Sequence, residues 1–255
     1  MLGLGSSLTN STKPFQPNDI SSLKAHFSAG YGIEKGGTGN AFVTKWKDVT
    51  GSGFYLKSPA ANSRPTVPTV SAADGSISGN PQVKFDNAND ADVLDLFDAA
   101  NDPVSIVLDT DQGGWSVFVV YTADNWDDGK IVVGNGANAN DHILHKSGAN
   151  TFQLKAGGTA KDFSLAGALT DDRFQCIAFT ADTNGLTRMY VDNVLANDTE
   201  TNTADFTISQ VGAGNDTGNM KGSIKEIIIF DSELTTQQRN SVYNYVLYYV
   251  GTSQQ

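Results

Sequence analysis

The stretch GSIKEIIIFDSELTTQQRNSVYNYVLYYVG, residues 222–251, combines an apolar run, a short polar turn and a helical pattern. From Ile224 to Phe230 most side chains are apolar, which is expected of a strand buried on both faces. Thr235 followed by Gln238 fits a capping box, the motif that begins many helices. The stretch therefore predicts a strand covered on both sides, followed by a helix.

The predicted helix carries one apolar stripe. Its positions follow the spacing i, i+3, i+4 and i+7 of a single helical face: Val242, Tyr245, Val246 and Tyr249. Gly251 is well placed as the residue that ends the helix. Such stripes usually belong to a core. We therefore expect the helix to pack on a β-structure, and a partner-binding aromatic helix is the alternative.

The rest of the chain is typical of short strands separated by Gly, Asn and Asp. Roughly ten apolar or alternating runs are separated by turn residues every ~8–12 positions, as in sandwiches and jelly rolls. Asn184-Gly185 is a strong hairpin turn. In the polar segment around Leu94 to Phe97 we expect a short helical turn. The pattern predicts an all-β, two-sheet antiparallel jelly-roll sandwich with a short C-terminal helix.

Charge and composition argue against some classes of partner. The 255 residues carry a formal net charge of −11, whereas nucleic-acid binding needs a basic surface. No apolar run is long enough for a membrane helix, so we expect neither nucleic-acid partners nor membrane insertion. The single cysteine, Cys176, excludes a disulfide within the chain and is expected to be a small buried side chain.

Four stretches, in this order, resemble the concanavalin A-like, laminin-G-like jelly-roll family. They are DISSLKAHFSAG (19–30), VTKWKDVTGSG (43–53), SRPTV with NPQVKFDN (63–67 and 80–87), and the hairpin from residue 172 with the closing stretch. Thr50 and Asn87 replace the usual Ser and Gly. The resemblance implies a jelly-roll domain over residues 18–255, preceded by an extended arm over residues 1–17.

Catalytic chemistry is not expected. Some members of the resembled family are glycoside hydrolases, whose retaining members need two carboxyl groups about 5 Å apart. No predicted strand of this chain has two acids at i and i+2. Glu226 is the one acid in a strong strand and stands alone, so we expect a structural, hydrogen-bonded side chain. His26 is solitary. A glycan-cleaving enzyme remains an alternative.

Carbohydrate and calcium are the ligands that the resemblance suggests. An exposed aromatic beside Asn and Asp side chains suits a sugar, and the candidates are Trp126, Asp124, Asp127, Asp128, Asn138 and Asn140. The alternative for Trp126 is a buried loop anchor. For calcium near a sheet rim, the candidates are Asp109, Asp111 and Asp141, and solvated loop acids are the alternative.

The first ten residues, MLGLGSSLTN, resemble the beginnings of some marine phage structural proteins. This resemblance implies a virion protein, such as a capsid decoration, fibre or tail-associated protein. Its partners would be capsid or tail proteins, other copies of itself, and host-surface glycans. The predicted assembly-arm contacts are Met1, Leu2, Leu4 and Phe15. The alternative is a secreted or cell-surface bacterial carbohydrate-binding module.

Overall fold

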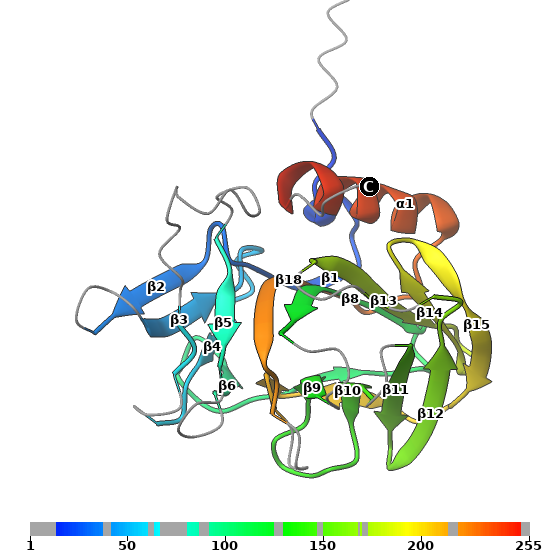
Figure 1. Ribbon diagram of the computed structural model, residues 1–255, viewed down its shortest axis with the longest axis horizontal. Helices are drawn as coiled ribbons and strands as arrows, with labels where there is room; N and C mark the ends of the chain where they lie inside the picture. Colours follow the sequence, from blue (N-terminus) through cyan, green and yellow to red (C-terminus); the bar gives the residue numbers. More distant parts are fainter. Residues whose placement is uncertain are drawn as a thin grey trace, which may run out of the picture.

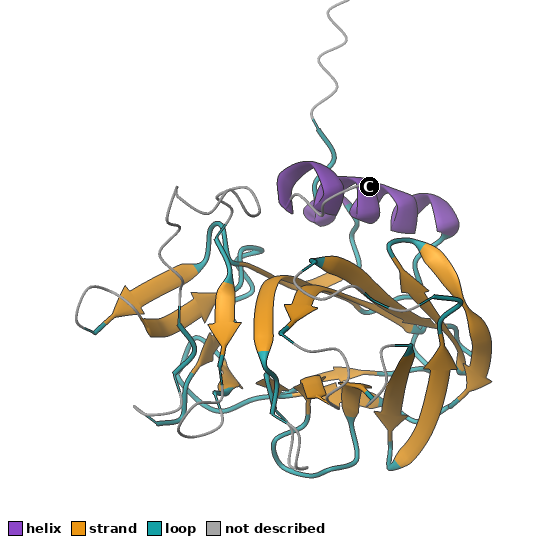
Figure 2. Cartoon of the chain, viewed as in Figure 1, coloured by secondary structure: helices purple, strands orange, loops and turns teal. Residues whose placement is uncertain are grey.

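The computed structural model describes residues 14–37, 42–60, 64–66, 81–86, 92–124, 130–146, 150–167, 169, 173–213 and 219–250 (Figure 1). Almost all of its regular structure is strand, and the helices lie together on one side (Figure 2).

The strands are β1 Leu23–Ser28, β2 Ile33–Gly36, β3 Phe42–Lys47, β4 Tyr55–Lys57, β5 Val83–Phe85, β6 Leu94–Phe97, β7 Ile106–Leu108, β8 Trp115–Ala123, β9 Lys130–Gly134, β10 His142–His145, β11 Thr151–Ala156, β12 Thr159–Ser164, β13 Gln175–Ala181, β14 Leu186–Val191, β15 Val194–Thr201, β16 Phe206–Ile208, β17 Gln210–Val211 and β18 Gly222–Phe230. The helical elements are a 3-10 turn at Pro17–Asp19, helix α1 at Thr236–Tyr245 and one π turn at Val246–Val250.

Two large sheets face each other. One has seven strands in the order β1-β18-β8-β13-β14-β15, with β5 also paired to β18. The other has nine strands in the order β12-β11-β10-β9-β17-β6-β4-β3-β2, and β7 pairs with β16 in a small separate sheet. The described ladders between these strands are antiparallel. The predicted antiparallel sandwich with a short C-terminal helix is confirmed.

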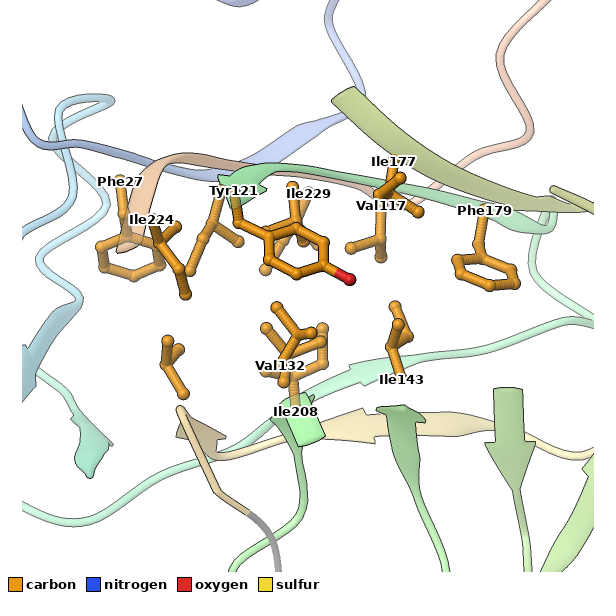
Figure 3. Packing of buried hydrophobic residues seen from close by; sticks show 14 of the residues in the cluster. Phe27, Val117, Tyr121, Val132, Ile143, Ile177, Phe179, Ile208, Ile224 and Ile229 are labelled. Atoms are coloured by element: carbon orange, nitrogen blue, oxygen red, sulfur yellow. The ribbon is translucent and has the colours of Figure 1, made fainter. Parts of the chain in front are cut away.

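The main core lies between the sheets. Side chains of the seven-stranded sheet, such as Phe27, Tyr121 and Ile229, point toward Val132 and Ile143 of the opposite layer (Figure 3). Because side chains alternate along a strand, the same strands also present apolar groups to the other side. The sandwich therefore needs a second cover over its seven-stranded sheet.

Helix α1 supplies that cover. It lies over the outer face of this sheet (Figure 1), and Val242, Tyr245 and Val246 pack there in a second core with Ile228 and Phe230. Ile227 and Ile229 belong to the first core. Strand β18 is thus apolar on both faces because a sheet covers one and a helix the other.

The predicted helix start is confirmed. Thr235 and Gln238 form the capping box, and the side chain of Thr235 accepts a hydrogen bond from the backbone N–H of Gln238. Gly251 and the side chain of Tyr249 lie outside the described residues. Within the described part of the chain, no helix is both long and apolar enough to cross a membrane.

One predicted element is wrong. Leu94 to Phe97 is not a helical turn but strand β6. Leu94 and Leu96 are buried in the main core, whereas Asp95 and Phe97 are partly exposed. This alternation has the period of a strand, and pairing with β4 and β17 on either side satisfies the backbone. The correction matters because it places Asp95 on the outer face of the nine-stranded sheet.

Candidate functional site

The site is built around Asp95, in the middle of a short strand. Strand β6 lies between β4 and β17, and Asp95 is paired directly with Gln210. Because neighbouring residues of a strand point to opposite faces, burying Leu94 and Leu96 forces Asp95 outward. The apolar residues of LDLF therefore position the carboxylate.

Beside Asp95 the surface forms an open pocket of about 300 Å³. Its polar lining comprises Asp95, Ser105, Asn135, Ser209 and Gln210, and its apolar lining includes Pro103 and Val104. Nε2 of Gln210 donates to Oδ1 of Asp95 at 2.7 Å, which orients the carboxylate. Among the described residues, the other carboxylate oxygen of Asp95 accepts no side-chain hydrogen bond. We call this cavity the Asp95 pocket.

The loop after β9 forms a firm wall of the Asp95 pocket. Oδ1 of Asn135 accepts from the backbone N–H of Ala137 at 3.0 Å and from Oγ of Ser209 at 3.3 Å. Oγ of Ser209 in turn accepts from the N–H of Gly136 at 2.9 Å. A side chain on Gly136 would collide with that of Gln210. These hydrogen bonds join the loop after β9 to Ser209, which lies between β16 and β17, and so hold the pocket in shape.

Burial raises the pKa of the Asp95 carboxyl above its usual value, and the hydrogen bond from Gln210 opposes the rise. A partly desolvated carboxylate that one amide orients is well suited to accept hydrogen bonds from ligand hydroxyl groups. Such perturbed acids are concentrated at functional sites.

Aromatic rings adjoin the same face. Phe97, two residues after Asp95, stacks on Tyr55 with ring centroids 5.6 Å apart and planes 12° from parallel. Nζ of Lys57 lies 5.3 Å from the Phe97 ring, and the hydroxyl of Tyr55 donates to Asn101 at 2.6 Å. The backbone of Phe97 forms an isolated antiparallel β-bridge with Pro103, which lines the pocket. The acid therefore lies near two stacked rings and next to Lys57, its neighbour on β4.

The structure brings some of the predicted sugar-binding residues to this region. Asn138 and Asn140 are exposed in the loop between β9 and β10, the loop whose first residues line the Asp95 pocket. Oδ1 of Asn138 accepts from the N–H of Asn140 at 2.9 Å. Asp124 is exposed at the end of β8, and Trp126, Asp127 and Asp128 lie outside the described residues. Their role in sugar binding stays a prediction.

The predicted calcium ligands do not form one cluster. Oδ1 and Oδ2 of Asp141 accept from the N–H of Gly157 and from Nδ2 of Asn135, at 3.0 and 3.3 Å. Oδ1 of Asp109 accepts from the N–H of Asp111 at 2.8 Å. Across the described ranges, no three His, Cys, Asp or Glu side chains are placed to hold a metal ion together. These acids support loops in the structure, and bound calcium stays a prediction.

A second polar cluster lies beneath α1. The sequence predicted no partner for Glu226 or His26, but in the structure these two side chains contact each other. Oε2 of Glu226 lies 2.6 Å from Nε2 of His26, and Oε1 accepts from Oγ of Ser28 at 2.7 Å. All three side chains are buried. The expectation that Glu226 is a hydrogen-bonded structural acid is met by these contacts.

A register shift in β18 lies next to this cluster. The pairing with β8 slips between Ile224 and Glu226, which is typical of a bulge. Lys225 is buried, and its Nζ lies 4.1 Å from the ring centroid of Phe174 in the second core. Burial lowers the pKa of Lys225 to about 8, although the charge of Glu226 acts in the opposite direction.

Of the predicted assembly-arm residues, Phe15 is half-buried and packs against the second core. Pro17 is buried at the start of the 3-10 turn. Met1, Leu2 and Leu4 lie outside the described residues.

Two antiparallel sheets face each other. Helix α1 covers the outer face of one sheet, and a polar pocket lies on the outer face of the other. This arrangement is a lectin-like jelly-roll domain. The chain belongs to the concanavalin A-like lectin/glucanases superfamily, whose sequence profile matches residues 78–238. No curated protein matches the chain.

Several solved structures share the fold. The receptor binding domain of botulinum neurotoxin D matches with a TM-score of 0.58 and 14% identity, over 91% of this chain and 54% of that one. Domain 4 of AbnA, a GH43 extracellular arabinanase from Geobacillus stearothermophilus solved with arabinotriose, gives 0.51 and 17%, over 85% and 96%.

Trypanosoma rangeli sialidase, solved with 2,3-difluorosialic acid, matches with a TM-score of 0.56 and 11% identity, over 92% of this chain. The chain spans only 34% of that sialidase. At such low identities the likeness establishes the fold alone.

Sequence reasoning missed the Asp95 pocket. The alternation in LDLF was available in the sequence, and as a strand it would have turned Asp95 outward. Gln210, Ser209 and Asn135 carry no comparable pattern, because only the order of strands in the sheet brings them to Asp95.

Proposed function

We propose that this chain is a non-enzymatic glycan-binding module that holds a saccharide in the Asp95 pocket. The observation that carries the proposal is the oriented, partly buried carboxylate beside neutral amide and hydroxyl groups. Neighbouring sugar hydroxyls can donate to a carboxylate and also exchange hydrogen bonds with amide and hydroxyl side chains. The lectin-like fold and the solved neighbours support this class of ligand.

The charge of Asp95 favours a neutral or amino sugar. A second negative charge, such as the carboxylate of an acidic sugar, would be repelled at short range in a partly desolvated pocket. The overall charge of −11 also disfavours the binding of an acidic sugar.

The absence of a partner acid supports binding rather than cleavage. Hydrolysis of a glycosidic bond ordinarily uses two carboxyl groups across the sugar. Among the described lining residues of the pocket, Asp95 is the single carboxylate. The proposal is that the module recognises a glycan and leaves it intact.

Asp95→Asn is expected to weaken glycan binding about 10-fold or more, because hydrogen bonds to a charged group contribute about 1.5–3 kcal/mol. The measurement is a glycan array followed by calorimetric titration with the best neutral oligosaccharide. Binding should also weaken as pH falls through the raised pKa of Asp95, since the ionised form is the acceptor. The asparagine variant should lack this acid dependence.

The matched control is Asp162→Asn. Asp162 belongs to β12 at the far edge of the same sheet, where it is held by Lys146 at 2.7 Å and Gln153 at 2.8 Å. Its replacement should leave binding unchanged.

Asp95→Asn should not lower the melting temperature at neutral pH, because a raised folded-state pKa means that the buried charge opposes folding above that pKa. Full binding by Asp95→Asn, or release of reducing ends from the bound glycan, would contradict the proposal.

We further propose that the module serves a phage virion, with capsid or tail proteins as partners. The support is the resemblance of the first residues to phage structural proteins and the packing of Phe15 against the second core. Because Phe15 packs against the domain, an arm bound to a capsid or tail protein would attach the sandwich to that protein.

Deleting residues 1–13 is expected to leave the melting temperature within a few degrees of the full chain, since Phe15 and Pro17 remain to pack. Incorporation of the truncated protein into particles, measured by sedimentation with the particle fraction, should fall. Normal incorporation would refute the docking arm while leaving glycan binding untouched.

A further inference from the structure

A groove of aromatic side chains lies beside α1, on the helix side of the seven-stranded sheet. It consists of two cavities of about 280 and 400 Å³, and Tyr245 lines both. We call it the helix-side groove and define it as the lining of these two cavities, which includes Phe15, His26, Tyr31, Asn244, Tyr245 and Tyr248. None of them belongs to the Asp95 pocket.

The groove gathers exposed apolar side chains. Tyr31 is 79% exposed, Tyr248 is 80% exposed and Val49 is 40% exposed. In the described part of the chain the other four exposed large hydrophobic side chains lie elsewhere, and each is less exposed than Tyr31 and Tyr248. Exposing two whole tyrosines costs free energy that a fold normally avoids by burial. Their concentration around one groove therefore indicates a binding surface.

The floor of the groove is preformed. His26 is 5% exposed, and its ring meets Tyr245 edge-on with centroids 5.8 Å apart. The buried carboxylate of Glu226 holds Nε2 of His26 at 2.6 Å, and Ser28 holds that carboxylate in turn. Because these contacts fix the ring, a ligand would meet a surface that needs little reordering.

The lining identifies the class of ligand. The described lining of the two cavities includes His26 but no Asp, Glu, Lys or Arg side chain. The polar lining is instead amide or hydroxyl, from Gln16, Asn18, Thr50 and Asn244. Such groups both donate and accept, as sugar hydroxyls do. A phosphate or carboxylate would find no Arg or Lys there.

We infer that the helix-side groove is a second saccharide site, specific for uncharged sugars. The negative face of a tyrosine ring attracts the slightly positive C–H groups on the flat side of a sugar ring. Tyr31 lines one cavity, Tyr248 lines the other, and Tyr245 lines both.

Two sites would make the module bivalent. The Asp95 pocket lies on the outer face of the nine-stranded sheet, whereas the helix-side groove lies on the helix side of the other sheet. One module could then bridge two glycan chains, and a surface rich in glycans would be held more tightly than either site alone allows.

The test is calorimetric titration of the full chain with cellotriose, xylotriose and arabinotriose as probes. The double variant Tyr31→Ala/Tyr248→Ala should fold normally, because both side chains are exposed, and it should bind about 10-fold more weakly or lose one of two binding events. The control is Leu195→Ala, another exposed side chain that lines neither site. The variant Asp95→Asn should keep the binding event of the groove.

Two results would overturn the inference. If Asp95→Asn alone abolishes all binding of the three probes, the groove is not a sugar site, although the proposed function stands. If the double tyrosine variant binds the probes as the wild type does but changes self-association in light scattering, the groove is a protein contact. If the double tyrosine variant loses the groove binding event and keeps the Asp95 event, the inference is supported.

Discussion

Replacing Glu226 by alanine is expected to lower the free energy of unfolding by about 3 kcal/mol, because it removes the acceptor of two buried side chains. His26 and Ser28 lie 2.6 and 2.7 Å from its carboxylate oxygens, and all three residues are buried. Without the carboxylate, both would stay desolvated and lose their partner. Chemical denaturation monitored by tryptophan fluorescence measures the change.

Two matched variants separate this effect from loss of charge in general. Glu34→Ala removes an exposed acid whose partner is Lys47, and such surface pairs contribute at most about 1 kcal/mol. Glu226→Gln keeps the shape and one acceptor, so its loss should lie between those of the two alanine variants. A loss below about 1 kcal/mol for Glu226→Ala would show that solvent or a rearranged neighbour satisfies His26 and Ser28.

The second large effect is expected at Gly222, where β18 begins. Its φ of +146° is rarely adopted by residues with a side chain, and a Cβ there would overlap the carbonyl oxygen of Thr122 on β8. Gly222→Ala should therefore cost about 3 kcal/mol through backbone strain and displacement of the first β18–β8 pair. The free energy of unfolding and hydrogen exchange along β18 measure the change.

Gly167→Ala is the control for Gly222→Ala. A Cβ at Gly167 would meet nothing within 4 Å, and its φ is not in the range that favours glycine. This variant should unfold within about 0.5 kcal/mol of the wild type. If both alanine variants were equally stable, the start of β18 would have to shift without loss of pairing, and our account of this strand would be wrong.

Local patterns predicted much of the fold. The apolar run of β18 and the capping box at Thr235 depend only on residues close in the chain, and both appear in the structure as expected. The hairpin at Asn184-Gly185 also follows the sequence, since Gly185 has a φ of +75°. Leu94 to Phe97 was the exception, because four residues in a polar segment are too few to establish a period.

The candidate sites could not be predicted in the same way. Gln210 and Asp95 are 115 residues apart, and Gly136 is 73 residues from Ser209. Their contacts depend on which strands become neighbours in the nine-stranded sheet, and no local pattern contains that order. The predicted loop candidates Asn138 and Asn140 came close because they belong to the loop that walls the pocket.

The stretch from residue 222 to 251 shows the same division. By itself the sequence determined that it forms a doubly buried strand and a capped helix, because side-chain periodicity and capping are local properties of the chain. Only the tertiary structure decided that Glu226 meets His26 and that Asp95 opens into a pocket. Those contacts join strands distant in sequence, and burial then determines which polar groups must be paired and which can meet a ligand.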